Sequence, residues 1–264
     1  MSFKLGKKAP KRLMSTPSLG DFLPKATSWP AVPAQGWESA VPASALSMLG
    51  NGPAPDNPPQ IPFGVGCCGP AGALGLAQAL SYNAGRPLIP TTMECMALYS
   101  AVTGFNLNAP LVNGQNPTDQ GTALIDLLNY WKNTGITIGG QVHKIVGYAS
   151  IDLTSLAQQR YATYLFGGLY LGINCPLSCQ ENTANWTYTP GSPIEGGHCV
   201  VRVGEGAAGG HTRSWGMFIP TANDFYLGYE DEGYVVITED WIDAQGKSPS
   251  HIDLAGLVAA AQAL

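Results

Sequence analysis

Charged side chains are scarce in this 264-residue sequence: only 12% of its residues are Asp, Glu, Lys or Arg, and it holds 4 histidines. No hydrophobic run approaches the roughly 18 residues that a membrane-spanning helix needs. The basic start is not followed by the apolar segment of a secretion signal. We therefore expect no membrane partner, and a location in the cytoplasm of the producing cell.

A disulfide framework and a zinc site are equally poorly supported. The sequence contains six cysteines: Cys67, Cys68, Cys95, Cys175, Cys179 and Cys199. Without a secretion signal these predict free thiols. Adjacent Cys67 and Cys68 would hardly both ligate one tetrahedral ion, and Cys175 and Cys179 have no nearby histidine in the sequence. We expect no metal and no cofactor.

Basic charge is concentrated at the start of the chain. Six of the 13 Lys and Arg residues fall within the first 25 positions beside one acid, Asp21, so this head carries +5 and the remainder −10. Such an asymmetry indicates an arm that docks on an acidic surface or on nucleic acid, or else a solvated tail. Because no aromatic residues alternate with these charges, nucleic acid is the less favoured partner.

Proline marks a boundary in the chain. Eleven of the 21 prolines fall within residues 1–62, with little helical or alternating periodicity. We interpret residues 1–61 as an extended, basic, Pro-rich arm, and residues 62–264 as the folded domain. Isolated apolar residues in the arm predict that it lies across a protein surface: Phe22, Leu23, Trp29, Trp37 and Leu49.

The folded domain is predicted to be α+β, with a helical first half and an antiparallel sheet in the second half. Residues 69–85 are apolar on nearly all sides, which predicts a buried central helix with Pro70 in its first turn. Further helices are expected at 91–104, at 118–135 with Thr118 or Asp119 as cap, at 152–167 and at 253–264. Strands are expected at 169–175, 198–206, 214–220 and 233–239.

The stretch "GVGCCGPAGALGLAQAL" places Cys68 at the start of the central helix. A helix N-terminus together with an imidazole lowers the pKa of a thiol and makes it a nucleophile. His198, which follows two glycines at the start of a predicted strand, is the histidine best placed to be that partner. The alternative for Cys68 is a buried structural thiol.

Four motifs in order resemble the papain-like cysteine peptidases over residues 62–241. They read Cys68-Gly69-Pro70-Ala71, Gly197-His198-Cys199-Val200, Arg213-Ser214-Trp215-Gly216 and Gly233-Tyr234-Val235-Val236, with 130 residues from Cys68 to His198. The resemblance implies that Cys68 is the nucleophile, that His198 is its base and that Trp215 shields the pair. Segments such as "GTALIDLLNYWKNTGI" and "YEDEGYVVITEDWI" resemble, more narrowly, papain-like proteins encoded by phages and prophages.

Two positions depart from the family pattern. The asparagine that orients the family's histidine is matched by Arg213, whose guanidinium cannot accept a hydrogen bond and is expected to repel a proton on His198. The glutamine that assists the oxyanion is matched by Pro62, which leaves Gln60 or Asn51 as candidates from a rearranged loop. Glu230, Asp231 and Glu232 are interpreted as a solvated turn.

Two functions follow from these residues. The first is a cysteine hydrolase acting on a protein or peptide substrate, with Cys68 and His198 as catalytic residues. The second is a catalytically impaired virion component that keeps the papain-like fold and binds neighbouring subunits, or further copies of itself, through its arm. Arg213 favours the second function, and the Cys68 and His198 pair favours the first.

Overall fold

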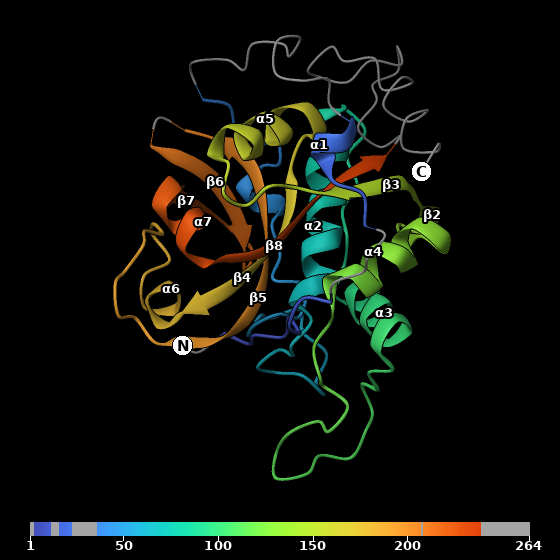
Figure 1. Ribbon diagram of the computed structural model, residues 1–264. Coiled ribbons are helices and arrows are strands. Elements are labelled where there is room, and N and C mark those ends of the chain that lie inside the picture. Colours follow the sequence, from blue (N-terminus) through green and yellow to red (C-terminus); the bar gives the residue numbers. More distant parts are fainter. Residues whose placement is uncertain (1–2, 12–15, 23–35, 207, 239–264) are drawn as a thin grey trace.

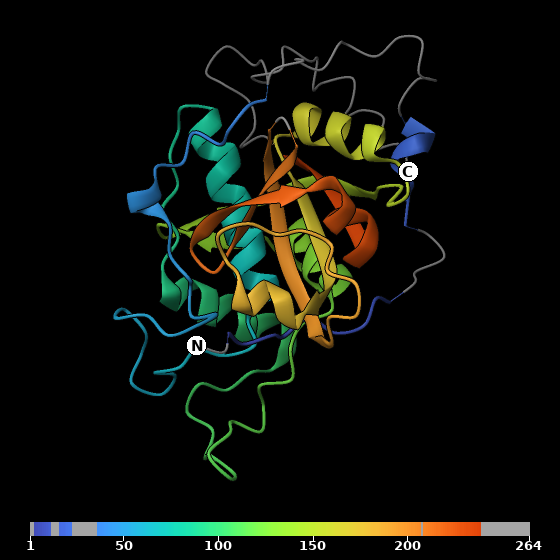
Figure 2. The ribbon, with the colours of Figure 1, turned by 90° about the vertical axis from the view of Figure 1, so that its left-hand side faces the viewer.

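A computed structural model describes residues 3–11, 16–22, 36–206 and 208–238 (Figure 1). One six-stranded antiparallel sheet has the order β3-β8-β4-β5-β6-β7. Helix α2 covers one face of this sheet and α7 the other, as a second view also shows (Figure 2). The strands are β3 (Ile145–Ser150), β4 (Leu169–Pro176), β5 (Ile194–Glu205), β6 (Gly209–Ser214), β7 (Met217–Ala222) and β8 (Glu230–Thr238).

The helices and two small strands complete the architecture. A hairpin of β1 and β2 adjoins α3, and α5 packs against β4, β5 and β8. The helices are α1 (Leu19–Phe22), α2 (Cys68–Asn83), α3 (Thr92–Thr103), α4 (Leu124–Asn133), α5 (Leu156–Phe166), α6 (Leu177–Glu181) and α7 (Asn223–Tyr229), with a 3₁₀ turn, η2 (Ala43–Ala45). The hairpin strands are β1 (Ile136–Ile138) and β2 (Gln141–His143).

Helix α2 is the buried central helix that the sequence predicts. Nearly all of its residues are buried, because apolar side chains and glycines surround it and leave no polar face. A Cβ atom at Gly75 would lie only 3.0 Å from the guanidinium carbon of Arg213, so this glycine lets β6 approach the helix backbone. Helix α2 thereby fixes the position of Cys68 against β5 and β6.

Helix α4 begins later than predicted. Its first residue is Leu124 and its N-cap is Ala123, so the predicted cap at Thr118 or Asp119 is wrong. The carboxylate of Asp119 is committed elsewhere: it accepts hydrogen bonds from the Gly66 amide at 3.0 and 3.1 Å and from the Tyr99 hydroxyl at 2.8 Å. Asp119 therefore holds the loop that leads into Cys68.

Two strand predictions need correction. Strand β5 begins at Ile194, so His198 lies inside the strand rather than at its first residue. The predicted strand 214–220 is broken by a tight turn at Trp215 and Gly216, whose φ values are 47° and 71°. This turn joins β6 to β7 and places Trp215 at the end of the hairpin. Both differences follow from strand pairing, of β5 with β4 and of β6 with β7, which a single strand pattern does not encode.

The acidic run Glu230, Asp231 and Glu232 is not a solvated turn. It begins β8 and pairs with β4, where Glu232 is opposite Gly172. Glu232 is only 6% exposed. Charged residues usually prefer solvent. Here the run pairs with the central strand β4, and Lys7 forms ion pairs with Asp231 and Glu232, so burial is tolerated.

The described parts of the N-terminal region pack on the rest of the protein. Trp37 exchanges backbone hydrogen bonds with Glu205, both at 2.8 Å, and its ring packs against Tyr164. Leu49 and Ile61 belong to the hydrophobic core. Leu23 and Trp29, and the helix predicted at 253–264, lie outside the described residues, and the side chain of Phe22 is likewise not described. Within the described parts of the chain, no helix combines the length and apolar character needed to cross a membrane.

Candidate active site

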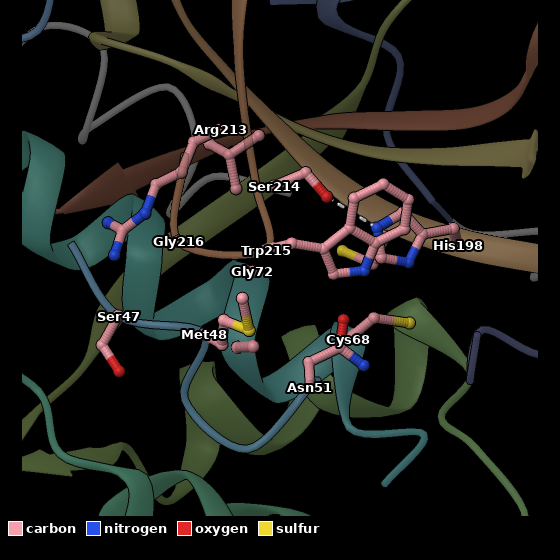
Figure 3. Close-up of a pocket in the computed structure, with 13 residues that line it drawn as sticks. Ser47, Met48, Asn51, Cys68, Gly72, His198, Arg213, Ser214, Trp215 and Gly216 are labelled. Carbon is pink, nitrogen blue, oxygen red and sulfur yellow. Dashed lines mark hydrogen bonds between the residues drawn. The ribbon is translucent and has the colours of Figure 1, made fainter. Parts of the chain in front are cut away.

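Cys68 and His198 line one small cavity between the start of α2 and the sheet (Figure 3). Its volume is about 20 Å³. That is room for roughly one water molecule. Asn51, Ser214 and Trp215 line the same cavity, so residues from four separate parts of the chain converge on it.

Cys68 is the first residue of α2 and is 1% exposed. Burial raises the pKa of its thiol to about 12, although backbone hydrogen bonds from Cys199, Gly6 and Gly69 act in the opposite direction. The helix start predicts a lowered pKa, but removal of the thiolate from water is the larger effect in this arrangement. Cys68 is therefore a neutral thiol near pH 7.

Cys67 points away from the cavity. Its Sγ lies 3.5 Å from the Leu49 carbonyl oxygen, and burial together with the neighbouring Cys95 holds its pKa well above the ordinary value. All six cysteines are buried free thiols, as the sequence predicts. Of the adjacent pair, only Cys68 lines the cavity.

The imidazole of His198 is held on one side and free on the other. Its Nε2 lies 2.7 Å from Ser214 Oγ, whereas its buried Nδ1 has no hydrogen-bond partner among the described residues. In Figure 3 the Cys68 side chain lies on the side of the ring opposite Ser214. Burial lowers the pKa of His198 to about 3, so the ring is neutral near pH 7.

Arg213 lines the same cavity as His198 but directs its guanidinium elsewhere. Its Nη1 donates a 2.6 Å hydrogen bond to the Gly75 carbonyl oxygen, and Figure 3 shows the guanidinium turned away from the imidazole. Burial lowers the pKa of Arg213 to about 10, which leaves it charged. The prediction that the charge of Arg213 repels a proton on His198 is therefore wrong. Because successive side chains of a strand point to opposite faces, the next residue, Ser214, faces His198 instead.

Trp215 covers His198. The two rings stack with centroids 4.6 Å apart and an interplanar angle of 20°. Phe3, from the start of the chain, stacks on the same indole at 4.2 Å and 11°. Trp215 thus occupies the shielding position that the resemblance implies. Phe3, which the sequence patterns did not single out, adds a second aromatic layer over it.

Asn51 reaches the site and Gln60 does not. The Asn51 side chain is buried and its Nδ2 donates to the carbonyl oxygens of Lys4 at 3.0 Å and Val65 at 3.1 Å. Gln60 is exposed and is not among the residues that line the cavity. Of the two oxyanion candidates, the structure brings only Asn51 to Cys68.

The N-terminal segment 3–8 crosses the site as an extended chain. The Gly6 carbonyl oxygen accepts a 2.6 Å hydrogen bond from the Thr122 amide, and the Lys8 amide donates to the Thr122 carbonyl at 2.9 Å. On the other side, the Lys7 amide donates to the Gly197 carbonyl at 3.0 Å, next to His198. Segment 3–8 therefore bridges the helical part and the sheet across Cys68, which no sequence motif indicated.

Comparisons with known proteins identify the fold. No family model matches the chain, and no curated protein matches its sequence. Xylellain, a cysteine protease from Xylella fastidiosa, superposes with a TM-score of 0.65 over 90% of this chain and 98% of its own, at 12% identity. The protein has the papain-like cysteine protease fold.

Two further structures support that fold. The procathepsin B S9 of Trypanosoma congolense matches with a TM-score of 0.62 over 89% of this chain and 86% of its own, at 10% identity. The Carica candamarcensis cysteine protease CMS1MS2, solved in complex with E-64, matches with a TM-score of 0.54 over 78% and 99%, at 12% identity. These similarities give no support to a phage or virion origin.

Proposed function

We propose that the protein is a cysteine peptidase, or a related amide hydrolase, with Cys68 as nucleophile and His198 as base. The observation that carries this proposal is the shared cavity: the two side chains lie 130 residues apart in the sequence, yet line one space of about 20 Å³. The unpartnered Nδ1 of His198 supplies the proton acceptor that a thiol nucleophile requires.

The reaction uses four groups of this site. His198 Nδ1 takes the thiol proton, and the sulfur of Cys68 bonds to the substrate carbonyl carbon while the carbonyl electron pair moves onto oxygen. The backbone N–H of Cys68 and Asn51 Nδ2 stabilise that oxyanion. The oxyanion then collapses, the C–N bond breaks, and the amine leaves with the proton from His198. Water, deprotonated by His198, hydrolyses the acyl-sulfur bond and restores the thiol.

Ser214 performs the orienting role. To leave Nδ1 free as an acceptor, His198 must carry its hydrogen on Nε2, which then donates to Ser214 Oγ at 2.7 Å. A hydroxyl oxygen accepts this bond from the neutral ring and equally from the imidazolium formed during the reaction. Arg213 in the asparagine position therefore does not argue against catalysis.

The described state is closed. Its cavity holds about one water molecule, and segment 3–8 covers Cys68 with backbone hydrogen bonds on both sides. Both reactive groups are neutral because burial raises the pKa of Cys68 and lowers that of His198. Displacement of the segment readmits water, which moves both pKa values back towards the range in which a thiolate and an imidazolium form.

The proposal is tested by alkylation with iodoacetamide, followed by intact mass and peptide mapping. We expect modification of Cys68 that increases strongly when segment 3–8 is displaced, and loss of that modification in Cys68→Ala. Cys67→Ala is the matched control and should leave it unchanged. A Cys68 that stays unreactive, with no amide hydrolysis after displacement, would overturn the peptidase proposal.

A second candidate is a papain-fold structural component without catalysis, which on the sequence resemblance would be a virion protein joined to its neighbours by the arm. The closed state favours this candidate, because the Cys68 thiol is neutral and segment 3–8 is held over it by backbone hydrogen bonds. It predicts that the displaced form binds neighbouring subunits and hydrolyses no peptide. Assembly measured by sedimentation, beside the hydrolysis assay, separates the two candidates.

A further inference from the structure

Lys7 buries its ammonium group between two carboxylates of β8. Its Nζ lies 2.8 Å from Asp231 Oδ2, 3.2 Å from Glu232 Oε1 and 3.2 Å from the Lys8 carbonyl oxygen. The Lys7 side chain is 1% exposed and that of Glu232 is 5% exposed. A buried lysine is rare in proteins unless a site is built to receive it.

The surrounding residues form such a site. A Cβ at Gly172 would lie 2.1 Å from Lys7 Cε, so the absence of a side chain on this strand position opens the channel for the lysine stem. The Tyr234 hydroxyl donates to Glu232 Oε2 at 2.9 Å and fixes that carboxylate. Among the described residues, Glu232 Oε1 has no hydrogen-bond partner, and its one close contact is the ion pair with Lys7. We call Gly172, Asp231, Glu232 and Tyr234 the ammonium pocket.

The segment that delivers Lys7 is bound mainly by its backbone. Thr122 bonds to Gly6 and Lys8, and Gly197 bonds to Lys7, in the manner of a strand added between two edges. Backbone bonds of this kind accept many sequences, whereas a side-chain pocket selects among them. The groove also runs directly beside His198, because Gly197 precedes it in β5.

These observations assign a ligand class to the site. We infer that the groove filled by residues 3–8 is the substrate groove of the proposed hydrolase, and that the ammonium pocket selects a peptide carrying a lysine side chain. This inference rests on the proposed function. Residues 3–8 are the intramolecular occupant, and Lys7 marks the position that a substrate lysine takes. A neutral side chain would leave Glu232 buried without its counter-ion.

The test uses the full chain with Gly6→Val. A Cβ at Gly6 would lie 1.8 Å from the Gly66 carbonyl oxygen, so valine expels the segment without altering the groove itself. The probe is a fluorescein-labelled peptide, Phe-Lys-Leu-Gly-Lys-Lys, compared with the same peptide containing norleucine at the position of Lys7. We expect at least about tenfold tighter binding of the lysine peptide, measured by fluorescence anisotropy.

Glu232→Gln in the Gly6→Val chain should remove the preference for lysine over norleucine. Glu38→Gln is the matched control, because the Glu38 side chain is 80% exposed and lies outside the groove. Equal binding of the lysine and norleucine peptides by the parent groove, or an unchanged preference in Glu232→Gln, would overturn the inference. If the groove binds the lysine peptide selectively but Cys68 is not alkylated and no peptide is hydrolysed, the proposed function is refuted. The assignment of the ammonium pocket as a lysine-binding site then still stands.

A second measurement does not depend on expelling the segment. Lys7→Ala in the full chain empties the ammonium pocket of its cation, and millimolar n-butylammonium should then raise the melting temperature, whereas n-butanol should not. Lys8→Ala, which keeps Lys7 in place, should show no difference between the two additives. An equal response of Lys7→Ala to butylammonium and butanol would contradict an ammonium site.

Discussion

Ser214 Oγ lies 2.7 Å from Nε2 of His198, on the side of the imidazole away from Cys68. This contact fixes which ring nitrogen remains available to the thiol. In the proposed mechanism this hydroxyl takes the role that the family pattern gives to an amide, and the residue that orients the ring is the one after Arg213.

Ser214→Ala is expected to slow the chemistry more than it weakens binding. Loss of the hydroxyl leaves a buried Nε2 hydrogen unpaired, which costs about 1–3 kcal/mol and frees the ring to change tautomer. We therefore expect a lower kcat with little change in KM for a lysine peptide, measured in the Gly6→Val chain. Ser214→Thr, which keeps the hydroxyl, should recover much of the rate. Equal kcat in Ser214→Ala and the parent would show that Ser214 does not orient the ring.

Arg213→Met should weaken the fold without altering the reactivity of the site. The substitution removes the 2.6 Å hydrogen bond to Gly75, and hydrogen bonds to charged groups contribute about 1.5–3 kcal/mol. We expect a loss of that size in the free energy of unfolding, measured with urea, and an unchanged rate of Cys68 alkylation per folded molecule. A rate that rises on loss of the charge would restore the electrostatic role that the sequence first suggested.

The contribution of His198 to stability should decline between about pH 6.5 and 3 because the ring is buried in its neutral form. Its pKa falls from 6.5 in the unfolded chain to about 3 in the folded protein. Above pH 6.5 neither state binds the proton, so the contribution of His198 is fully present. As the pH falls below 6.5 only the unfolded state gains the proton, and that contribution is lost progressively until about pH 3.

Urea unfolding at a series of pH values checks this dependence. His198→Gln should lose less stability than the parent between pH 6.5 and 3.5, with a difference on the order of a few kcal/mol. His211→Gln is the control, since His211 lies in a half-buried position outside the cavity. Parallel pH profiles for the parent and His198→Gln would contradict a buried neutral ring.

Asn51→Ala should reduce turnover, and Gln60→Ala should not. Asn51 lines the cavity with Cys68, and its Nδ2 donates to the Lys4 carbonyl of the covering segment, so in the open form it is positioned to donate to a substrate oxyanion. Removal of one oxyanion donor lowers kcat by about 10²–10³-fold. The comparison is made on the Gly6→Val chain with a lysine peptide. A fall in both variants, or in neither, would remove Asn51 from the mechanism.

The α+β organisation could be predicted because local signals mark its elements, and the order of the four motifs indicated that Cys68 and His198 meet, as their shared cavity shows. Proline and glycine bound α2, and β-branched residues mark β5 and β8. The sequence placed Arg213 beside His198 and did not single out Ser214, for a physical reason: the two residues are adjacent in the motif, and one position along a strand reverses the direction of a side chain. Which of Arg213 and Ser214 faces His198 depends on how β5 pairs with β6, and no local sequence pattern gives that pairing.

The acidic run was misread for a related reason. In isolation Glu230, Asp231 and Glu232 are typical of a solvated turn, and only the distant Lys7 makes burial of Glu232 favourable. Asn51 was one of two candidates expected from a rearranged loop, and only the folded chain shows that it, and not Gln60, lines the cavity with Cys68. Contacts of this kind depend on residues that meet only after folding, and a single sequence gives little indication of them.

The covering segment also constrains the timing of synthesis. Lys7 leaves the ribosome well before its ion-pair partners Asp231 and Glu232, which are made 224 or more positions later. At translation rates of about 5–20 residues per second, this interval lasts on the order of ten seconds or more. The ion pairs of Lys7 can therefore form only after β8 has been made, and until then each newly made molecule lacks the side-chain contacts that anchor the segment.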